Sequence, residues 1–314
     1  MKVVAFGGGH GLSVSLRALR QVPGLAVTAV VTVADDGGSS GRLRAERGVL
    51  PPGDLRQALA ALAGADPVSA KAARLFQHRF GGAGSLSGHT VGNLLLCGLM
   101  ELHLDPVDAL DEAAALLRVS GRVLPMSRVP VHIEADVTGP DGTVHLVRGQ
   151  HEVAVTQGHV ERVRISPGAA PACAEAVAAV RDADWLVFGP GSWYTSVIPH
   201  LLVPELAVAI LGSPARRLVT LNLAAEKETA GLPVPDHLRA LTRYLPGLRA
   251  DVVLADGTAV GDPEPVRRAA ESLGARLVLA PVAVADGGPR HDPSALAAAL
   301  SGILPYGAPP TLGT

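Results

Sequence analysis

The chain has 314 residues and is 48% hydrophobic, which is enough to bury a large core as one big domain or as two smaller ones. Its formal net charge of -2 excludes a broad electrostatic attraction to nucleic acid or to anionic lipid, so neither is expected as a partner and any bound anion must be held locally. The two cysteines, Cys97 and Cys173, and the scattered histidines lack metal-ligand spacing, so no metal site is expected. Without a secretion signal or an apolar run long enough to span a bilayer, the sequence predicts a cytoplasmic location.

The N-terminal residues predict a strand, turn, helix and strand unit. Lys2–Phe6 is an apolar run, Gly7–Gly11 is a glycine-rich turn, and Leu12–Val22 is amphipathic. A second apolar run, Ala26–Val33, follows. In open parallel sheets ligands gather beyond the carboxyl ends of the strands, so the glycine turn and the residues after Val33 are expected on the same rim.

The segment after this second run is the most polar part of the unit. It holds two carboxylates, Asp35 and Asp36, followed by Gly37, and its remaining polar candidates are Ser39, Ser40 and Arg42. The carboxylates are suited to accept hydrogen bonds from sugar or ribose hydroxyls, to coordinate magnesium, or to act as a base on a substrate hydroxyl. The alternative is an Asx-type turn in which the carboxylates cap local amides.

The glycine turn is a candidate anion site. Gly8, Gly9, His10 and Gly11 let backbone amides approach a phosphate, and the following helix adds its N-terminal dipole. The turn is neither the dinucleotide pattern GxGxxG nor a P-loop, because no GK[ST] follows. A tight strand-to-helix turn without a ligand is the alternative.

A helical region is predicted from Asp54 to about Arg118, with Asp54 as the N-cap of its first helix. Within it, Leu86–Leu96 opens an apolar helix whose first turn is polar. His89 and Asn93 lie four residues apart and are expected on one face. They are candidate ligand contacts, although a lone histidine at a helix start is also a common structural group.

The rest of the chain predicts a β-rich insertion and then a return to alternating strands and helices. The insertion covers residues 122–165, with a hairpin turn at Gly139–Gly142. The later elements are a helix at Ala172–Arg181, strands at Trp185–Phe188, Ala207–Leu211, Leu218–Leu221 and Val252–Leu254, a helix at Pro263–Leu273 and a strand at Arg276–Leu279. This alternation predicts one α/β domain over residues 1–314, with a Rossmann-like, doubly wound and mostly parallel sheet, and a C-terminal tail over residues 302–314.

A second glycine turn follows the predicted strand Trp185–Phe188. Gly189, Pro190, Gly191 and Ser192 supply backbone amides and a hydroxyl, so the two turns are suited to hold two parts of one ligand. Nucleophilic catalysis by Ser192 is not expected, because the GxSxG elbow is absent.

These segments resemble the gluconeogenesis-factor family, the YvcK-type proteins, within the superfamily of the 2-phospho-L-lactate transferase CofD. The resemblance rests on six collinear segments: Gly7–Ser13, Val31–Leu43, Leu50–Arg56, Leu86–Leu96, Gly121–Pro125 and Gly189–Ser196. It implies a Rossmann-type fold that binds a nucleotide sugar or a dinucleotide across the strand ends. The residues implied to line that cleft are the first glycine turn, Asp35, Asp36, Asp54, His89, Asn93, Gly191, Ser192 and Asn222.

The resemblance also implies a role: a regulator of cell shape and wall synthesis during growth on gluconeogenic carbon sources, which senses a UDP-sugar and needs no cofactor for binding. The alternative is a transferase that moves a phospholactyl group from a nucleotide donor to a deazaflavin precursor, with Asp35 or Asp36 as the catalytic group and Mg²⁺ as cofactor. An NAD-dependent dehydrogenase ranks last, because the GxGxxG spacing is missing. A homodimer is the default expectation for such a protein.

This chain departs from the family pattern in two places. His10 stands where the family usually has threonine, and Ala224–Thr229 replaces the usual Met-Thr-Gln-Pro-Gly-Glu-Thr run. These changes are expected to alter which sugar or base is accepted while the fold persists.

Overall fold

The computed structural model describes residues 1–156, 158–229 and 232–304. A seven-stranded parallel sheet forms its centre, in the order β10-β9-β8-β7-β1-β2-β3. The strands are β1 (Lys2–Gly7), β2 (Ala26–Val31), β3 (Arg122–Pro125), β7 (Trp185–Phe188), β8 (Arg216–Thr220), β9 (Val252–Ala255) and β10 (Arg276–Leu279). The chain therefore winds outward in one direction from β1 and in the other from β7, which makes the sheet doubly wound as predicted.

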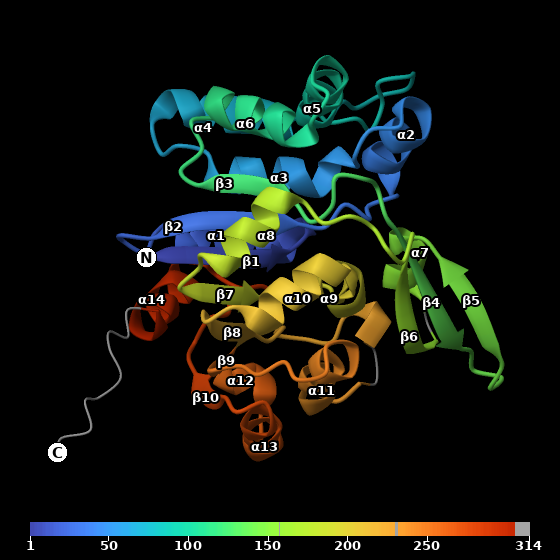
Figure 1. Cartoon of the computed structure of the whole chain (residues 1–314). Coiled ribbons are helices and arrows are strands. Elements are labelled where there is room, and N and C mark those ends of the chain that lie inside the picture. Colours follow the sequence, from blue (N-terminus) through green and yellow to red (C-terminus); the bar gives the residue numbers. More distant parts are fainter. Residues whose placement is uncertain (157, 230–231, 305–314) are drawn as a thin grey trace.

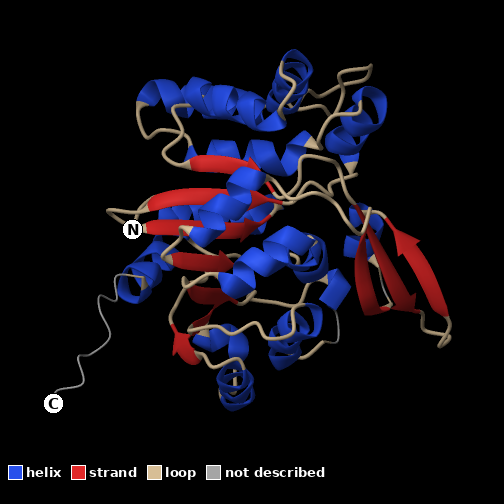
Figure 2. Ribbon diagram, viewed as in Figure 1, coloured by secondary structure: helices blue, strands red, loops and turns tan. Residues whose placement is uncertain are grey.

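Helices cover both faces of this sheet (Figures 1 and 2). α1 (Gly9–Leu19), α3 (Pro52–Leu62) and α14 (Pro293–Ile303) pack together on one side. α8 (Ala174–Arg181), α9 (Ile198–Leu202) and α10 (Pro204–Gly212) lie on the other side. The other helical elements are α2 (Gly38–Arg47), α4 (Pro67–Gln77), α5 (Val91–Leu102), α6 (Pro106–Leu116), α7 (Gln150–Val155), the π-helix η1 (Trp193–Val197), the 3-10 helix η2 (Lys227–Thr229), α11 (Val234–Tyr244), α12 (Gly257–Val260) and α13 (Glu264–Ser272).

A second, antiparallel sheet stands beyond the carboxyl ends of the main strands (Figure 1). It consists of β4 (His132–Thr138), β5 (Val144–Arg148) and β6 (His159–Ser166), in the order β5-β4-β6. It begins at His132 rather than at residue 122, because Arg122–Pro125 pairs with β2 as the edge of the main sheet. β4 carries the alternating burial that the sequence pattern predicts, with Ile133, Ala135 and Val137 buried, whereas no residue of the edge strand β5 is buried.

Aromatic packing fixes the junction between the two halves of the main sheet. Phe6 on β1 and Phe188 on β7 are fully buried and stack with ring centroids 4.9 Å apart and planes 8° from parallel. Such stacking and burial of large rings is a strong contribution to core packing. It holds β1 and β7 in register at the point where the winding reverses.

Three predicted elements need correction. Ala207–Leu211 is not a strand but lies in α10, which has Pro204 in its first turn and buries Leu206, Ala209 and Ile210 at helical spacing. Asp54 is not an N-cap, because α3 already begins at Pro52. Residues 302 and 303 still belong to α14, and residues 305–314 of the predicted tail lie outside the described residues.

No single helix in the described part of the chain is both long and apolar enough to cross a membrane. The bent pair Trp193–Leu202 and Pro204–Gly212, at 82°, passes that test by length and composition only.

Candidate functional site

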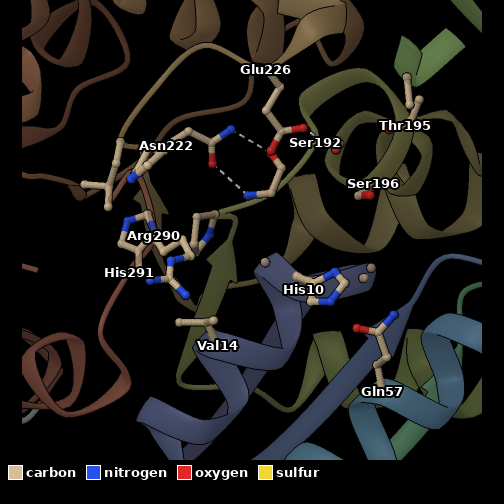
Figure 3. A pocket seen from close by; sticks show the side chains of 18 of the residues that line it. His10, Val14, Gln57, Ser192, Thr195, Ser196, Asn222, Glu226, Arg290 and His291 are labelled. Carbon is tan, nitrogen blue, oxygen red and sulfur yellow. Dashed lines mark hydrogen bonds between the residues drawn. The ribbon is translucent and has the colours of Figure 1, made fainter. Parts of the chain in front are cut away.

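A cavity of about 1080 Å³ lies at the carboxyl ends of β1 and β7, where the winding of the sheet reverses. This volume is at the upper limit of the roughly 300–1,000 Å³ typical of small-molecule sites. Figure 3 shows His10 and Val14 of α1 on one wall, Ser192 and Asn222 on another, and Gln57 of α3 at the side. The point where a doubly wound sheet reverses is the usual ligand position in this architecture.

All four residues of the first glycine turn, Gly8 to Gly11, line this cavity. Three of them belong to α1, which begins at Gly9 rather than at Leu12, so the turn is also the first turn of the helix. The first N–H groups of a helix have no internal partner and carry the positive end of its dipole. The Gly9 N–H donates to the Asp54 carboxylate, so the N–H groups of the turn that are left for a ligand are those of His10 and Gly11.

The glycines of this turn are required by close approaches. A Cβ at Gly11 would collide with the Pro190 carbonyl oxygen and lie 2.6 Å from Gly191 Cα. A Cβ at Gly8 would collide with the Asp54 carboxylate and lie 2.5 Å from Thr32 Cγ2. The two predicted glycine turns are thus in direct contact, one from β1 and one from β7.

The second turn is held by Asn222, which follows β8. Gly191 N–H donates to Asn222 Oδ1 at 2.8 Å, and Asn222 Nδ2 donates to the Gly191 carbonyl at 2.9 Å. Ser192 Oγ donates to Glu226 Oε2 (Figure 3). Pro190, Gly191, Ser192 and Asn222 line the cavity, whereas Gly189 does not: it forms the bend after β7, and its carbonyl accepts the Ser15 hydroxyl at 3.1 Å.

Three carboxylates line the cavity, Asp35, Asp54 and Glu226, and the last of these accepts the Ser192 hydroxyl. Burial raises the pKa of Asp35, against hydrogen bonds from Ser40 and Gly37. Burial and then the charge of Asp35 raise the pKa of Asp54 to about 7, although its carboxylate accepts hydrogen bonds from the Gly9 N–H and from Gln150. Asp54 is thus poised between its two protonation states at neutral pH, directly beside the first turn of α1.

Asp36, a predicted ligand contact, does not line the cavity. Its carboxylate accepts the N–H groups of Gln150 at 3.1 Å and His151 at 3.0 Å, at the start of α7. Consecutive residues in extended backbone point to opposite sides, so Asp36 faces the small sheet while Asp35 faces the cavity. The local Asx-type bond is made by Asp35, whose Oδ1 accepts the Gly37 N–H at 3.0 Å, whereas Asp36 caps the distant helix α7.

The remaining predicted contacts form a polar network behind the carboxylates rather than the cavity wall. Ser39 Oγ lies 2.9 Å from His89 Nδ1, Asn93 Nδ2 donates to Ser39 Oγ at 2.9 Å, and Arg56 Nε donates to Asn93 Oδ1 at 2.8 Å. His89 and Asn93 are therefore brought together as predicted, although His89 precedes α5 instead of lying on it. Three further residues predicted as ligand contacts, Gly37, Ser40 and Arg42, also lie outside the cavity lining.

The match to a known family covers most of this architecture. A family model described as 2-phospho-L-lactate transferase CofD matches residues 3–278. The chain belongs to the CofD family. The family prediction is thereby confirmed.

Relatives of this CofD-family chain carry one recurring name. The "Gluconeogenesis factor" of Bacillus subtilis is 38% identical over 278 residues, which cover 88% of this chain and 84% of the relative. A Mycobacterium tuberculosis protein whose name also contains the words gluconeogenesis factor is 52% identical over 308 residues, which cover 96% of this chain and 90% of the relative. Two crystal structures of a UPF0052-family protein from Bacillus halodurans match at TM-scores of 0.84 and 0.85 with 37% identity, covering 95% of this chain and 98% of that one. The fold prediction is confirmed by this likeness.

Several residues of the cavity wall were not predicted. Gln150 of α7 donates through Nε2 to the Thr195 carbonyl at 3.2 Å and also bonds Asp54, so it bridges the two halves of the sheet. Arg290 and His291 enter from the loop before α14 (Figure 3), and burial lowers the pKa of His291. The available signal was the run Gly287–Pro293, in which glycines, a proline, an arginine and a histidine precede a helix start.

The donor set of the cavity does not contain a histidine or carboxylate cage for a metal. Among residues 1–156, 158–229 and 232–304, no group of three or more His, Cys, Asp or Glu side chains is placed to hold a metal ion. Asp35, Asp54 and Glu226 all line the cavity, but they do not form such a group.

Proposed function

We propose that this protein binds a nucleotide sugar, with a dinucleotide as the related option, and acts as a regulator of the gluconeogenesis-factor type. One observation carries the proposal: the cavity lies where the winding reverses, and two glycine turns meet there beside the first turn of α1. Backbone amides at a helix N-terminus favour a diphosphate, since they combine free donors with the positive end of the helix dipole.

The cavity side chains support this placement of the ligand. Arg17 adds positive charge to the wall, whereas Arg290 is ion-paired with Asp286. Asp35, Asp54 and Gln57 offer polar groups suited to sugar or ribose hydroxyls. Protonation of Asp54 would remove a negative charge next to the diphosphate, and its raised pKa of about 7 favours that form when an anion binds. In this scheme Asp36 keeps α7 in place and does not touch the ligand.

We extend the proposal to the cellular role that the family resemblance implies, the control of cell shape and wall synthesis during growth on gluconeogenic carbon. Support for the gluconeogenic part comes from relatives named gluconeogenesis factor that cover most of this chain. The ligand occupancy of the cavity would be the signal, and the nucleotide sugar would report the supply of wall precursors.

A transferase of the 2-phospho-L-lactate type is the second candidate. It is favoured by the family description and by the pKa of Asp54 near 7, which suits a general base close to neutral pH. Mg²⁺ is commonly held by one or two carboxylates together with substrate phosphates, so Asp35 would hold it and Asp36 would not. The metal would supply charge screening for the donor phosphates, while Asp54 orients the acceptor hydroxyl.

Calorimetric titration with UDP-N-acetylglucosamine, NAD and GDP tests the binding proposal. We expect the UDP-sugar to bind, and Asp35→Asn to weaken it while Asp108→Asn, an exposed change on α6, leaves it unaffected. Absence of binding by all three ligands would overturn the proposal.

An assay with a deazaflavin precursor and its activated lactyl donor separates the two candidates. Magnesium-dependent product that disappears in Asp35→Asn would establish the transferase. Nucleotide-sugar binding without product supports the regulator.

A further inference from the structure

The two edges of the antiparallel sheet β5-β4-β6 differ in what covers them. At the β6 edge the Val163 N–H donates to Tyr244 Oη of α11 at 2.7 Å, so the chain itself supplies a partner there. The opposite edge is formed by β5, which pairs with β4 alone among the described strands. Figure 1 shows β5 as the outermost strand of this sheet, away from the helices that cover the main sheet. One long side of β5 is therefore open to a strand from outside.

The hydrogen bonds at the two ends of β5 show which main-chain groups lie on the open side. The Thr143 carbonyl accepts the Gly139 N–H at 2.8 Å before the strand, and the Gly149 N–H donates to the Ile133 carbonyl at 2.8 Å after it. Residues of an antiparallel strand bond alternately to one neighbour and to the other, so the odd-numbered residues of β5 bond to β4. The residues that direct their N–H and C=O groups outward are Val144, Leu146 and Arg148.

Two of these outward residues carry exposed apolar side chains. Val144 is 62% exposed and Leu146 is 48% exposed. Natural proteins usually protect such an edge with charged side chains, a proline or a bulge. Between Val144 and Arg148 the strand has no proline and no shift of register, and Arg148 already lies 3.2 Å from Glu134 Oε1. The edge thus combines available main-chain groups with uncovered apolar surface.

We propose that β5 pairs in antiparallel orientation with β5 of a second copy of this chain, about a two-fold axis at Leu146. In this register Leu146 lies opposite the partner's Leu146, and Val144 lies opposite the partner's Arg148. The outward residues then exchange N–H and C=O hydrogen bonds with the same residues of the partner. The two antiparallel sheets become one continuous sheet, whatever ligand fills the cavity.

The character of β5 favours a second copy over an unrelated strand. The pairing is self-complementary, because apolar side chains meet at the axis and Arg148 faces an uncharged valine, so no like charges lie opposite one another. The outlying position of β5 in Figure 1 lets the axis lie outside the main sheet of each copy. Since β5 has only five residues, the interface is smaller than the roughly 1,600 Å² of a standard complex, and we expect a dimer that dissociates on dilution.

Disulfide trapping tests both the pairing and its register. Leu146→Cys should give a cross-linked dimer on mild oxidation, because directly paired Cα atoms in such a ladder lie about 5.5 Å apart, within the range of a disulfide. Val144→Cys is the matched control: its two copies would lie about 14 Å apart and should not cross-link. The natural cysteines, Cys97 and Cys173, are buried. Equal cross-linking of the two variants, or none in Leu146→Cys, would overturn the proposal.

Sedimentation equilibrium with charged variants tests the two-fold axis. Leu146→Lys and Leu146→Glu should each weaken the association of the wild type at least tenfold, because each places two like charges directly opposite one another. An equimolar mixture of the two variants should associate again, since opposite charges then meet. Leu104→Lys is the control, because Leu104 is fully exposed between α5 and α6, outside the antiparallel sheet.

The outcomes decide the proposal without reference to nucleotide-sugar binding. A wild type that stays monomeric up to about 1 mM, where association would contribute less than about 4 kcal/mol, would overturn it. Association that is unchanged in Leu146→Lys, or a mixture that associates no better than its components, would overturn it as well. Circular dichroism shows that each variant is folded, which we expect because the side chain at position 146 is exposed and the bonds between β4 and β5 are made by its neighbours.

Discussion

The protonation of Asp54 gives the sharpest prediction from this structure. Its pKa of about 7, against an ordinary 3.8, arises because the carboxylate is buried and faces the charge of Asp35. One pKa unit corresponds to about 1.4 kcal/mol, so the ionised form is destabilised in the folded protein by at most roughly 4 kcal/mol. Replacement by asparagine removes this titration and keeps a side-chain oxygen that can accept the Gly9 N–H.

The sign of the effect follows from proton binding. Between pH 4 and pH 7 the folded protein retains a proton on Asp54 that the unfolded chain has released, so the free energy of unfolding falls as the pH rises through this window and is flat above it. Between pH 5 and pH 8 the wild type should lose about 1–3 kcal/mol more than Asp54→Asn, since structural relaxation reduces the full value.

Urea unfolding followed by circular dichroism at pH 5 and pH 8 measures this difference. Asp108→Asn is the control, because Asp108 is exposed in the first turn of α6 and should leave the wild-type pH dependence intact. Equal losses of stability in the wild type and in Asp54→Asn would refute the reasoning, since Asp54 would then titrate at the same pH in both states.

Three further predictions concern the site and the core. Gly11→Ala should weaken nucleotide-sugar binding at least tenfold in calorimetry, because its Cβ would collide with the Pro190 carbonyl and separate the two turns. Asp36→Ala should speed amide hydrogen exchange over Gln150–Val155, because the first two N–H groups of α7 lose their acceptor. Leu59→Ala should lower the free energy of unfolding by about 2–5 kcal/mol in urea, as its fully buried side chain leaves a cavity.

Each of these predictions has an outcome that contradicts it. Gly98→Ala is the control for the glycine change, because a Cβ there meets nothing within 4 Å, and an equal loss of affinity in both variants would contradict the steric argument. Unchanged exchange in Asp36→Ala would show that α7 is held by other contacts. Stability equal to the wild type in Leu59→Ala would mean that the surrounding helices close the space completely.

The sequence alone determined the strand framework and the two glycine turns. The bounds predicted for Trp185–Phe188 and Arg276–Leu279 match β7 and β10, because each run follows a predicted helix in the alternation of strands and helices. The six segments that carry the family resemblance follow one another along the chain, so they could be recognised from the sequence alone. By contrast, the short apolar run Ala207–Leu211 was assigned to the wrong class, because such a run fits a strand or a helix equally well.

Only the tertiary structure decided which polar residues face the cavity. Asp35 and Asp36 are adjacent in sequence, but the packing of α7 against the loop places one carboxylate in the cavity and the other on α7. Arg290 and His291 are separated from the first glycine turn by nearly the whole chain, and they reach it because α14 returns from the edge of the sheet to pack on α1. These placements depend on strand order and helix packing, which join residues distant in sequence and leave no local pattern to read.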